Sequence, residues 1–355
     1  MKQKNNTDFR LSLDETLIIK GLAICLMLWY HLFFHPPQCG EFAFQSLAQF
    51  GKVCVSLFLF VSAYGLTLQY SKVFDKPITE TFKFMIKRFV KFYANYWVVF
   101  LIFVPIGIFV FGRSLQDAYG AANPVVPAIF DFLGLQLWRS YNPTWWFNFL
   151  IINLYLLFPL LYFFTKKTPV LLLLSSAVIL IVSFPLISVD VREFVFHFVL
   201  GIAFAMYVDK INRFLNRFNP WLLLSLLIFI LVVLFCLRTI YIVPLLRGTR
   251  LDGIIALNIV LLVLLVIRNI RIVTPHISRV FVFLGKHSIN IYLTHTFVYF
   301  LWFSEFIYSF KNPILIFIVL LVICLAISIV LEYGKKVVNL PALVSNVNNK
   351  IENKL

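Results

Sequence analysis

Charged side chains are scarce in this chain. Only 13% of its 355 residues are Asp, Glu, Lys or Arg, whereas 61% are hydrophobic and 18% are aromatic. A soluble globular domain has about a quarter of its residues charged, so this composition excludes a soluble protein. It also excludes a disordered chain, because unfolded segments are poor in aromatic residues and this sequence contains 41 Phe.

Acidic residues are rarer than basic ones, and none lies in the middle of an apolar segment. There are 15 Asp and Glu against 31 Lys and Arg. An ion-coupled transporter normally keeps a carboxylate near the centre of the membrane, so this absence argues against that class. The five cysteines have no spacing typical of metal ligands, and we expect no metal site.

The apolar runs predict an all-α integral membrane protein. A membrane-spanning helix needs about 20 predominantly apolar residues, and this length divides the chain into a bundle of about ten transmembrane helices. Residues 1–355 are expected to form a single membrane domain. The predicted spans lie near 16–35, 48–69, 91–111, 144–164, 169–187, 192–208, 220–237, 251–267, 286–303 and 312–334.

The distribution of Lys and Arg predicts the orientation of these spans. Loops and tails on one side carry 23 basic residues, and those on the other side carry 8. Cytoplasmic loops are the richer ones, so both termini are predicted to be cytoplasmic. The net charge of +16 is then an orientation signal rather than a sign of nucleic-acid binding, since the basic residues are dispersed between apolar runs. The Asn- and Lys-rich ends, 1–9 and 346–355, are expected to be frayed tails.

Three histidines lie in the interior of the predicted spans, away from their ends: His31, His197 and His295. An ionisable group at membrane depth is costly and is therefore a functional candidate. His31 follows Lys20 by eleven residues, about 16 Å along one helix, which places it in the outer half of the span. A neutral imidazole there can take a proton from a hydroxyl, or it can serve only to bond a neighbouring helix. We interpret His197 as structural.

Ser288, Tyr292 and His295 are spaced so that all three share one face of the ninth predicted span. A polar stripe among apolar residues faces protein or water rather than lipid. It either contributes to a site or joins helices by hydrogen bonds.

Two further groups of residues lie near the ends of spans. Before the third span, Lys83, Lys87 and Lys91 recur at every fourth residue with Arg88 beside them, and they bind either anionic lipid head groups or the phosphates of a donor such as coenzyme A. Before the fourth span, aromatic residues form either an interfacial belt or a rim that stacks on sugar rings. These aromatic residues are Trp138, Tyr141, Trp145 and Trp146.

The motifs, in this order, resemble acyltransferase family 3, whose membrane proteins O-acylate bacterial surface polysaccharides. Lys20 and His31 are similar to a basic residue and a histidine of the family's first span, where most members have Arg at the first position. Arg88 and Lys91 resemble an Arg-x-x-Arg motif before the third span, again with Lys in place of Arg. Lys cannot form the bidentate fork of Arg, so donor contacts are expected to be weaker or differently arranged.

The resemblance extends to two later motifs. Trp145 and Trp146 resemble the start of the family's fourth-span signature, and the run from Leu284 to His295 resembles the ninth-span signature. Together the motifs cover about residues 15–335 of the chain.

The resemblance implies a reaction and a role for each motif. Acetyl-coenzyme A, or another short acyl donor, would bind at the cytoplasmic side, and a hydroxyl of an envelope polysaccharide or lipid-linked glycan would be the acceptor. The expected donor-binding residues are Lys20, Arg88 and Lys91; the expected catalytic residues are His31 and His295; the expected acceptor-binding residues are Tyr292, Ser288, Trp145 and Trp146.

Two other classes stay open at this point. One is a multi-span transporter or flippase, and the other is a polymerase or another membrane transferase, such as the membrane-bound O-acyltransferases that also use an intramembrane histidine. The resemblance favours acyl transfer, in a multi-pass protein of the bacterial cytoplasmic membrane that contacts membrane lipid and binds no nucleic acid.

Overall fold

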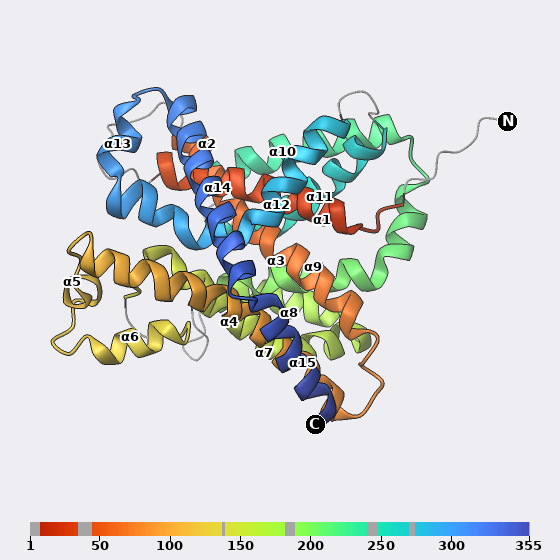
Figure 1. The fold of residues 1–355 in the computed structure, drawn as a ribbon. Coiled ribbons are helices and arrows are strands. Elements are labelled where there is room, and N and C mark those ends of the chain that lie inside the picture. Colours follow the sequence, from red (N-terminus) through yellow and green to blue (C-terminus); the bar gives the residue numbers. More distant parts are fainter. Residues whose placement is uncertain are drawn as a thin grey trace. The chain divides into compact units, whose positions relative to one another are not determined.

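Capping residues mark the start of several helices. The Ser12 hydroxyl accepts a hydrogen bond from the Glu15 backbone, and the Ser12 backbone N–H donates to the Glu15 carboxylate, a capping box that begins the first helix. Asn312, followed by Pro313, begins the last long apolar helix. The computed structural model describes residues 8–34, 45–136, 139–181, 189–239, 248–269 and 274–354, and every regular element in these ranges is a helix (Figure 1).

The helices fall into two compact units, and each unit is described by itself. Unit 1 contains α1 (Leu13–Phe33), α2 (Gln45–Phe50), η1 (Gly51–Val53), α3 (Cys54–Tyr70), α8 (Pro169–Ile181), α9 (Val189–Leu215), α10 (Pro220–Thr239), η4 (Gly248–Leu251) and α11 (Asp252–Asn269). Unit 2 contains α4 (Ile78–Phe109), α5 (Leu115–Tyr119), α6 (Val125–Phe132), η2 (Pro143–Trp145), η5 (Phe297–Trp302), α13 (Ser304–Ser309), α14 (Pro313–Val337) and α15 (Leu340–Lys354). Two helices contribute to both units: α7 (Trp146–Lys167), divided after Leu157, and α12 (Thr274–Thr296), divided after Lys286.

Within the described ranges, eight helical segments are long and apolar enough to cross a membrane. They match the predicted spans except 169–187 and 286–303. The described part of α8 has 13 residues, and 286–303 is not a separate α-helix, because α12 already begins at Thr274 and passes into the π-helix η5 at Phe297. The all-helical, multi-pass membrane class is confirmed. The count of ten spans and the cytoplasmic location of the termini stay predictions.

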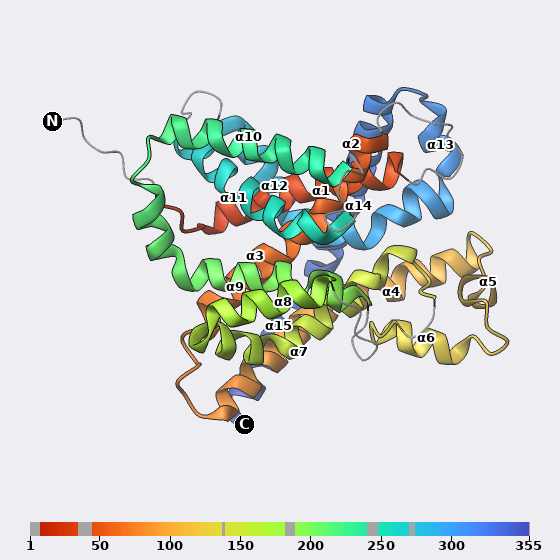
Figure 2. The same cartoon turned by 180° about the vertical axis from the view of Figure 1, so that it is seen from behind.

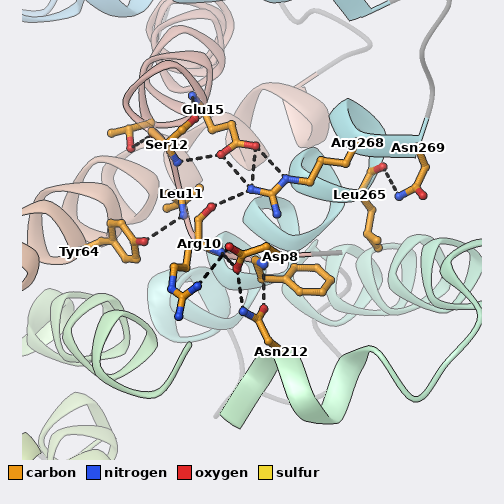
Figure 3. Close-up of polar contacts among 12 residues, drawn as sticks. Asp8, Arg10, Leu11, Ser12, Glu15, Tyr64, Asn212, Leu265, Arg268 and Asn269 are labelled. Carbon is orange, nitrogen blue, oxygen red and sulfur yellow. Dashed lines mark hydrogen bonds and ion pairs between the residues drawn. The ribbon is translucent and has the colours of Figure 1, made fainter. Parts of the chain in front are cut away.

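The start of α1 is held by two other helices of unit 1 (Figure 3). The Leu11 backbone N–H donates to the Tyr64 hydroxyl of α3 at 3.0 Å. Arg268 of α11 donates from Nε and Nη2 to the Glu15 carboxylate, each at 3.0 Å. This bidentate pair fixes the first turn of α1 against the last turn of α11.

The expectation of frayed ends is wrong for the parts that the structure describes. Phe9 is 1% exposed, and its backbone N–H donates to Asn212 of α9 at 2.8 Å. At the other end, α15 stays helical to Lys354 and packs along α4, where Lys87 donates to the Glu352 carboxylate. Hydrogen bonds and charge pairs therefore anchor both ends.

In unit 1, α3 and α9 lie side by side in both views and meet through small residues (Figures 1 and 2). A Cβ atom added at Gly201 of α9 would lie 2.5 Å from the Phe60 carbonyl oxygen and 2.9 Å from the Ala63 side chain. Helices in a membrane associate through such close packing, because apolar side chains gain little by leaving lipid. Gly65 of α3, by contrast, has open space around it.

In unit 2, a helical hairpin of α5 and α6 follows α4, between the predicted spans 91–111 and 144–164. The hairpin folds back along α4 (Figure 1). The Tyr93 hydroxyl donates to the Leu133 carbonyl and the Trp97 indole donates to the Phe132 carbonyl, both at 2.9 Å. Trp97 precedes the end of α4 at Phe109 by twelve residues, about 18 Å.

The chain then enters α7 beside the middle of α4. The Asn142 side chain accepts a hydrogen bond from the Thr144 backbone N–H at 3.0 Å. This bond caps η2, the turn that leads into α7. Trp145 is 2% exposed, with its ring centroid 5.1 Å from that of Tyr96 and 5.6 Å from that of Phe100. The polar residues that lead into α7 are therefore buried inside unit 2.

We expect the two glycines of unit 1 to respond oppositely to alanine. Gly201→Ala should destabilise the protein by about 1–3 kcal/mol, because its Cβ would force α9 away from α3. Gly65→Ala should be neutral or stabilising by up to about 1 kcal/mol, because alanine favours the helix and meets no neighbour. Thermal unfolding in detergent measures both. Equal loss from the two variants would contradict close packing at Gly201.

Candidate functional site

The residues singled out from the sequence are divided between the two units, so their contacts are described within each unit. Lys20 and His31 belong to α1 of unit 1. Those of unit 2 are Arg88, Lys91, Trp145, Trp146, Ser288, Tyr292 and His295. In the described part of the chain, no three His, Cys, Asp or Glu side chains gather so as to hold a metal ion.

Lys20 and His31 occupy opposite halves of α1. His31 lies in the last turn of the helix, about 16 Å along the axis from Lys20, and both side chains are partly exposed. The Tyr30 ring stands edge-on to the imidazole, with centroids 5.1 Å apart. The structure confirms that one helix carries both residues, while the role of each stays a prediction.

His295 is buried on α12 and has a defined tautomer. Its Nδ1 lies 2.8 Å from the Tyr292 carbonyl oxygen and 3.2 Å from that of Ile291. Carbonyl oxygens only accept, so Nδ1 carries the proton and Nε2 keeps its lone pair. Nε2 lies 3.3 Å from the Thr296 hydroxyl, which lies 2.9 Å from the Thr144 hydroxyl. The imidazole is therefore oriented with its basic nitrogen toward hydroxyl groups.

Tyr292 meets the same turn of the chain at the start of α7. Its hydroxyl lies 3.1 Å from the Thr144 carbonyl oxygen and 3.2 Å from Oδ1 of Asn148. Ser288, one turn earlier on α12, is 8% exposed. The predicted polar stripe thus faces protein, and Tyr292 and His295 converge where α7 begins.

The basic stretch of α4 is partly occupied by acidic partners. Lys83 pairs with Glu80 at 2.9 Å, and Lys87 pairs with Glu352 of α15. The Arg88 guanidinium lies over the Phe84 ring, 5.1 Å from its centroid, and is partly exposed. Lys91 is exposed. The structure thus pairs two of the four basic residues of this stretch, Lys83 and Lys87, with carboxylates.

The aromatic residues before α7 do not form one exposed rim. Tyr141 and Trp145 are buried, and a sugar ring could stack on Trp145 only by displacing Tyr96 or Phe297, whose rings lie 5.1 and 5.8 Å away. Trp146 is partly exposed. Trp138 lies outside the described residues. Stacking on a sugar thus depends on Trp146 in this structure.

A comparison with protein families identifies the chain. A family model described as an acyltransferase domain matches residues 12–333. The chain belongs to acyltransferase family 3. Together with the eight apolar helices, this makes it a multi-pass membrane acyltransferase. No curated protein and no solved structure matches the chain.

The acyltransferase also contains a buried polar network that was not predicted from the sequence. Lys335 of α14 is 5% exposed, and its ammonium donates to Glu332, Asn95 and Asn290 at 2.7, 2.8 and 2.9 Å. The three acceptors come from α14, α4 and α12. The pair Glu332 and Lys335, one turn apart near the end of an apolar run, was the available signal.

The same network continues to a serine and a histidine. Lysine only donates, so the Asn290 carbonyl faces Lys335 and its amide nitrogen faces Ser328, at 3.0 Å. The Ser328 oxygen lies 2.8 Å from Nδ1 of His287. These bonds hold α12, α14 and α4 together within unit 2.

Asp131 is a second buried group that the sequence did not single out. It lies at the end of α6, is 5% exposed, and accepts hydrogen bonds from the Tyr119 hydroxyl at 3.0 Å and the Tyr141 backbone at 2.7 Å. Burial raises the pKa of the Asp131 carboxyl from its ordinary 3.8 to about 6, although these hydrogen bonds favour the charged form. No cation pairs with it among the described contacts.

We predict that Asp131 makes the acyltransferase less stable as the pH rises from about 4 to about 6. A raised folded-state pKa means that the folded protein holds the proton more tightly, so stability is full below the ordinary pKa and is lost as pH passes the folded-state value. The loss should be roughly 2–3 kcal/mol. The measurement is the free energy of unfolding of wild type and of Asp131→Asn at several pH values in this range. The difference between the two proteins should change with pH.

Asp117→Asn is the matched control. Asp117 is exposed in the same hairpin, and its hydrogen bonds to Ser114 lower the pKa of its carboxyl. Its replacement should leave the fall in stability unchanged. If wild type and Asp131→Asn keep a constant difference from pH 4 to pH 7, the Asp131 carboxyl has no raised pKa.

Proposed function

We propose that this acyltransferase moves an acetyl or other short acyl group from cytoplasmic acyl-coenzyme A to a hydroxyl of a cell-envelope polysaccharide, or of its lipid-linked precursor, outside a bacterial cytoplasmic membrane. The observation that carries the proposal is the position of His31. It is a partly exposed imidazole in the last turn of a membrane helix, about 16 Å from Lys20, in a chain that the family model matches from 12 to 333.

In the proposed reaction His31 acts as the general base. It takes the proton from the acceptor hydroxyl while the hydroxyl oxygen bonds to the carbonyl carbon of the thioester. The carbon–sulfur bond then breaks, coenzyme A leaves as a thiolate, and the thiolate receives the proton from the imidazolium. The products are an ester and free coenzyme A, with no oxidation or reduction.

The donor is proposed to bind near the basic stretch of α4. Its guanidinium allows Arg88 to contact two phosphate oxygens at once, and Lys91 adds a point charge. Lys83 and Lys87 are paired with Glu80 and Glu352, respectively, so their charges are partly neutralised in this structure. Lys20 is proposed as a further donor-binding residue.

The buried groups of α12 are proposed to act on the acceptor or the developing oxyanion. The lone pair of His295 Nε2 can receive a proton, and the Tyr292 hydroxyl can donate to a negative oxygen. Trp146, which is partly exposed, is the proposed stacking residue, and the buried Ser288 and Trp145 are proposed to support the acceptor site from within unit 2.

We expect His31→Ala to lower acyl transfer by about 10²- to 10⁴-fold, because proton removal by a positioned base contributes that much to a rate. The assay is ester-linked acetate on surface polysaccharide, measured by NMR before and after mild base in a deletion strain that carries each variant. His276→Ala, at an exposed histidine of α12, should restore the wild-type spectrum.

Two outcomes would overturn parts of this proposal. A correctly inserted His31→Ala protein that restores full acetylation would exclude His31 as the base. Unchanged acetate in every strain, with no turnover of labelled acetyl-coenzyme A, would instead favour a flippase or polymerase.

We expect Arg88→Ala to raise the KM for acetyl-coenzyme A by about tenfold or more, since a charged hydrogen bond to phosphate would be lost. The measurement is initial rates with purified protein in detergent. Lys350→Ala, which removes a charge from α15, is the control and should leave this KM within about twofold. Equal KM values for Arg88→Ala and wild type would place the donor elsewhere.

A further inference from the structure

A buried arginine at one end of unit 1 has no partner for one of its nitrogens. Arg238 of α10 donates from Nε to Asp252 of α11 at 2.6 Å and from Nη2 at 3.2 Å. The two side chains are 1% and 0% exposed. The third nitrogen, Nη1, is buried and has no hydrogen-bond partner. A guanidinium can only donate, so Nη1 requires an acceptor that the described residues do not supply.

This arginine lies at the end of unit 1 that contains His31. Glu15, in the first turn of α1, pairs with Arg268, in the last turn of α11. At the other end, Tyr30, which is in ring contact with His31, lies close enough to Arg238 and Asp252 to experience both charges. Tyr30 and Glu15 are fifteen residues apart, about 22 Å.

Packing holds the neighbours of Arg238 in place. Gly51 of η1 sits so close to α1 that an added Cβ would lie 3.0 Å from the Tyr30 side chain. The preceding residue, Phe50, has its ring centroid 5.9 Å from the Arg238 guanidinium. An aromatic ring and a donor without an acceptor therefore flank the His31 end of α1.

The charges around the pair indicate the class of ligand. Asp252 lies within range of the charges of Arg238, Lys52 and Glu193. These four residues comprise two positive and two negative groups. Asp190 adds a further negative charge near Lys52 and Glu193. Such a surrounding does not favour a polyanion such as coenzyme A. It suits a neutral ligand rich in hydroxyls, whose oxygens accept from Nη1 and whose O–H groups donate to carboxylates.

We propose that Arg238 is part of an acceptor-binding site in unit 1, where Nη1 donates to an oxygen of a neutral, hydroxyl-rich glycan beside the His31 end of α1. This inference rests on the proposed function for its reaction, but the binding itself requires no acyl donor. The glycan is either the finished polysaccharide or its lipid-linked precursor, which share this chemistry.

The test measures glycan binding and acyl transfer separately. The probes are surface polysaccharide from a deletion strain, freed of esters by mild base, and the lipid-linked precursor fraction of the same strain. Binding is followed by thermal shift of the full chain in detergent without donor. Transfer is followed with labelled acetyl-coenzyme A, giving a KM for each substrate.

Two variants separate recognition from folding. Arg238→Lys keeps a positive charge beside Asp252 but loses the forked geometry, and the double variant Arg238→Gln with Asp252→Asn removes both charges without leaving one unpaired. Arg268→Lys is the matched control, because it makes the same change in a bidentate pair at the other end of α11.

Both Arg238 variants should weaken binding of the glycan and raise its KM by about 10- to 100-fold, as expected for loss of a charged hydrogen bond. The KM for acetyl-coenzyme A should stay within about twofold, and Arg268→Lys should leave glycan binding unchanged. The probe that shows the larger difference between wild type and variants identifies the natural acceptor.

Three outcomes would count against the inference or the function. If folded Arg238 variants bind both glycans like wild type, the acceptor site does not include Arg238. If Arg268→Lys weakens glycan binding equally, the effect is structural and the inference is wrong. If wild type binds a glycan through Arg238 but transfers no acetyl group, the proposed function fails while the binding site stands.

Discussion

The bidentate pair between Glu15 and Arg268 sets the position of the first helix, and the placement of Lys20 and His31 depends on it. An ion pair largely removed from water gains stability from good geometry and from hydrogen bonds to its remaining atoms. Here the hydrogen bond from the Ser12 backbone to Glu15 and the donation of Arg268 Nη2 to the Arg10 carbonyl supply two such bonds, while Arg268 Nη1 is buried without a hydrogen-bond partner among the described residues. The start of α1 is therefore fixed in both rotation and depth relative to α11.

Close backbone contacts continue this alignment along α1. Gly21 lies against the Phe281 backbone of α12, and Gly285 of α12 lies against the Leu17 backbone, with no room for a side chain at either position. In a bilayer the hydrophobic effect does not draw helices together, so such contacts and the charged pairs must hold the unit. They hold the part of α1 that carries Lys20 against α12.

In unit 2, the main constraint is that buried backbone groups at the start of α7 need hydrogen-bond partners. Because α7 begins beside the middle of α4, the backbone groups of its first turn lie away from water and need partners inside the protein. At the turn η2 that leads into α7, the Asn142 side chain accepts from the Thr144 backbone N–H and the Tyr292 hydroxyl donates to the Thr144 carbonyl. Tyr292 of the α12 stripe therefore has a structural contact at this turn, and the Thr144 hydroxyl of the same turn lies near the Thr296 hydroxyl that faces His295 Nε2.

The sequence by itself determined the membrane class, most of the spanning helices and the family, because these follow from apolar length, from residue type and from motifs within single helices. It also placed Lys20 and His31 on one helix and Tyr292 and His295 on one face. It could not show that the hairpin of α5 and α6 folds back along α4, that Trp145 is buried, or that Arg238 pairs with Asp252 and Lys335 with Asn95. Those outcomes depend on contacts between helices far apart in the chain, where packing and the need to satisfy each buried polar atom decide the partner, and only the tertiary structure contains that information.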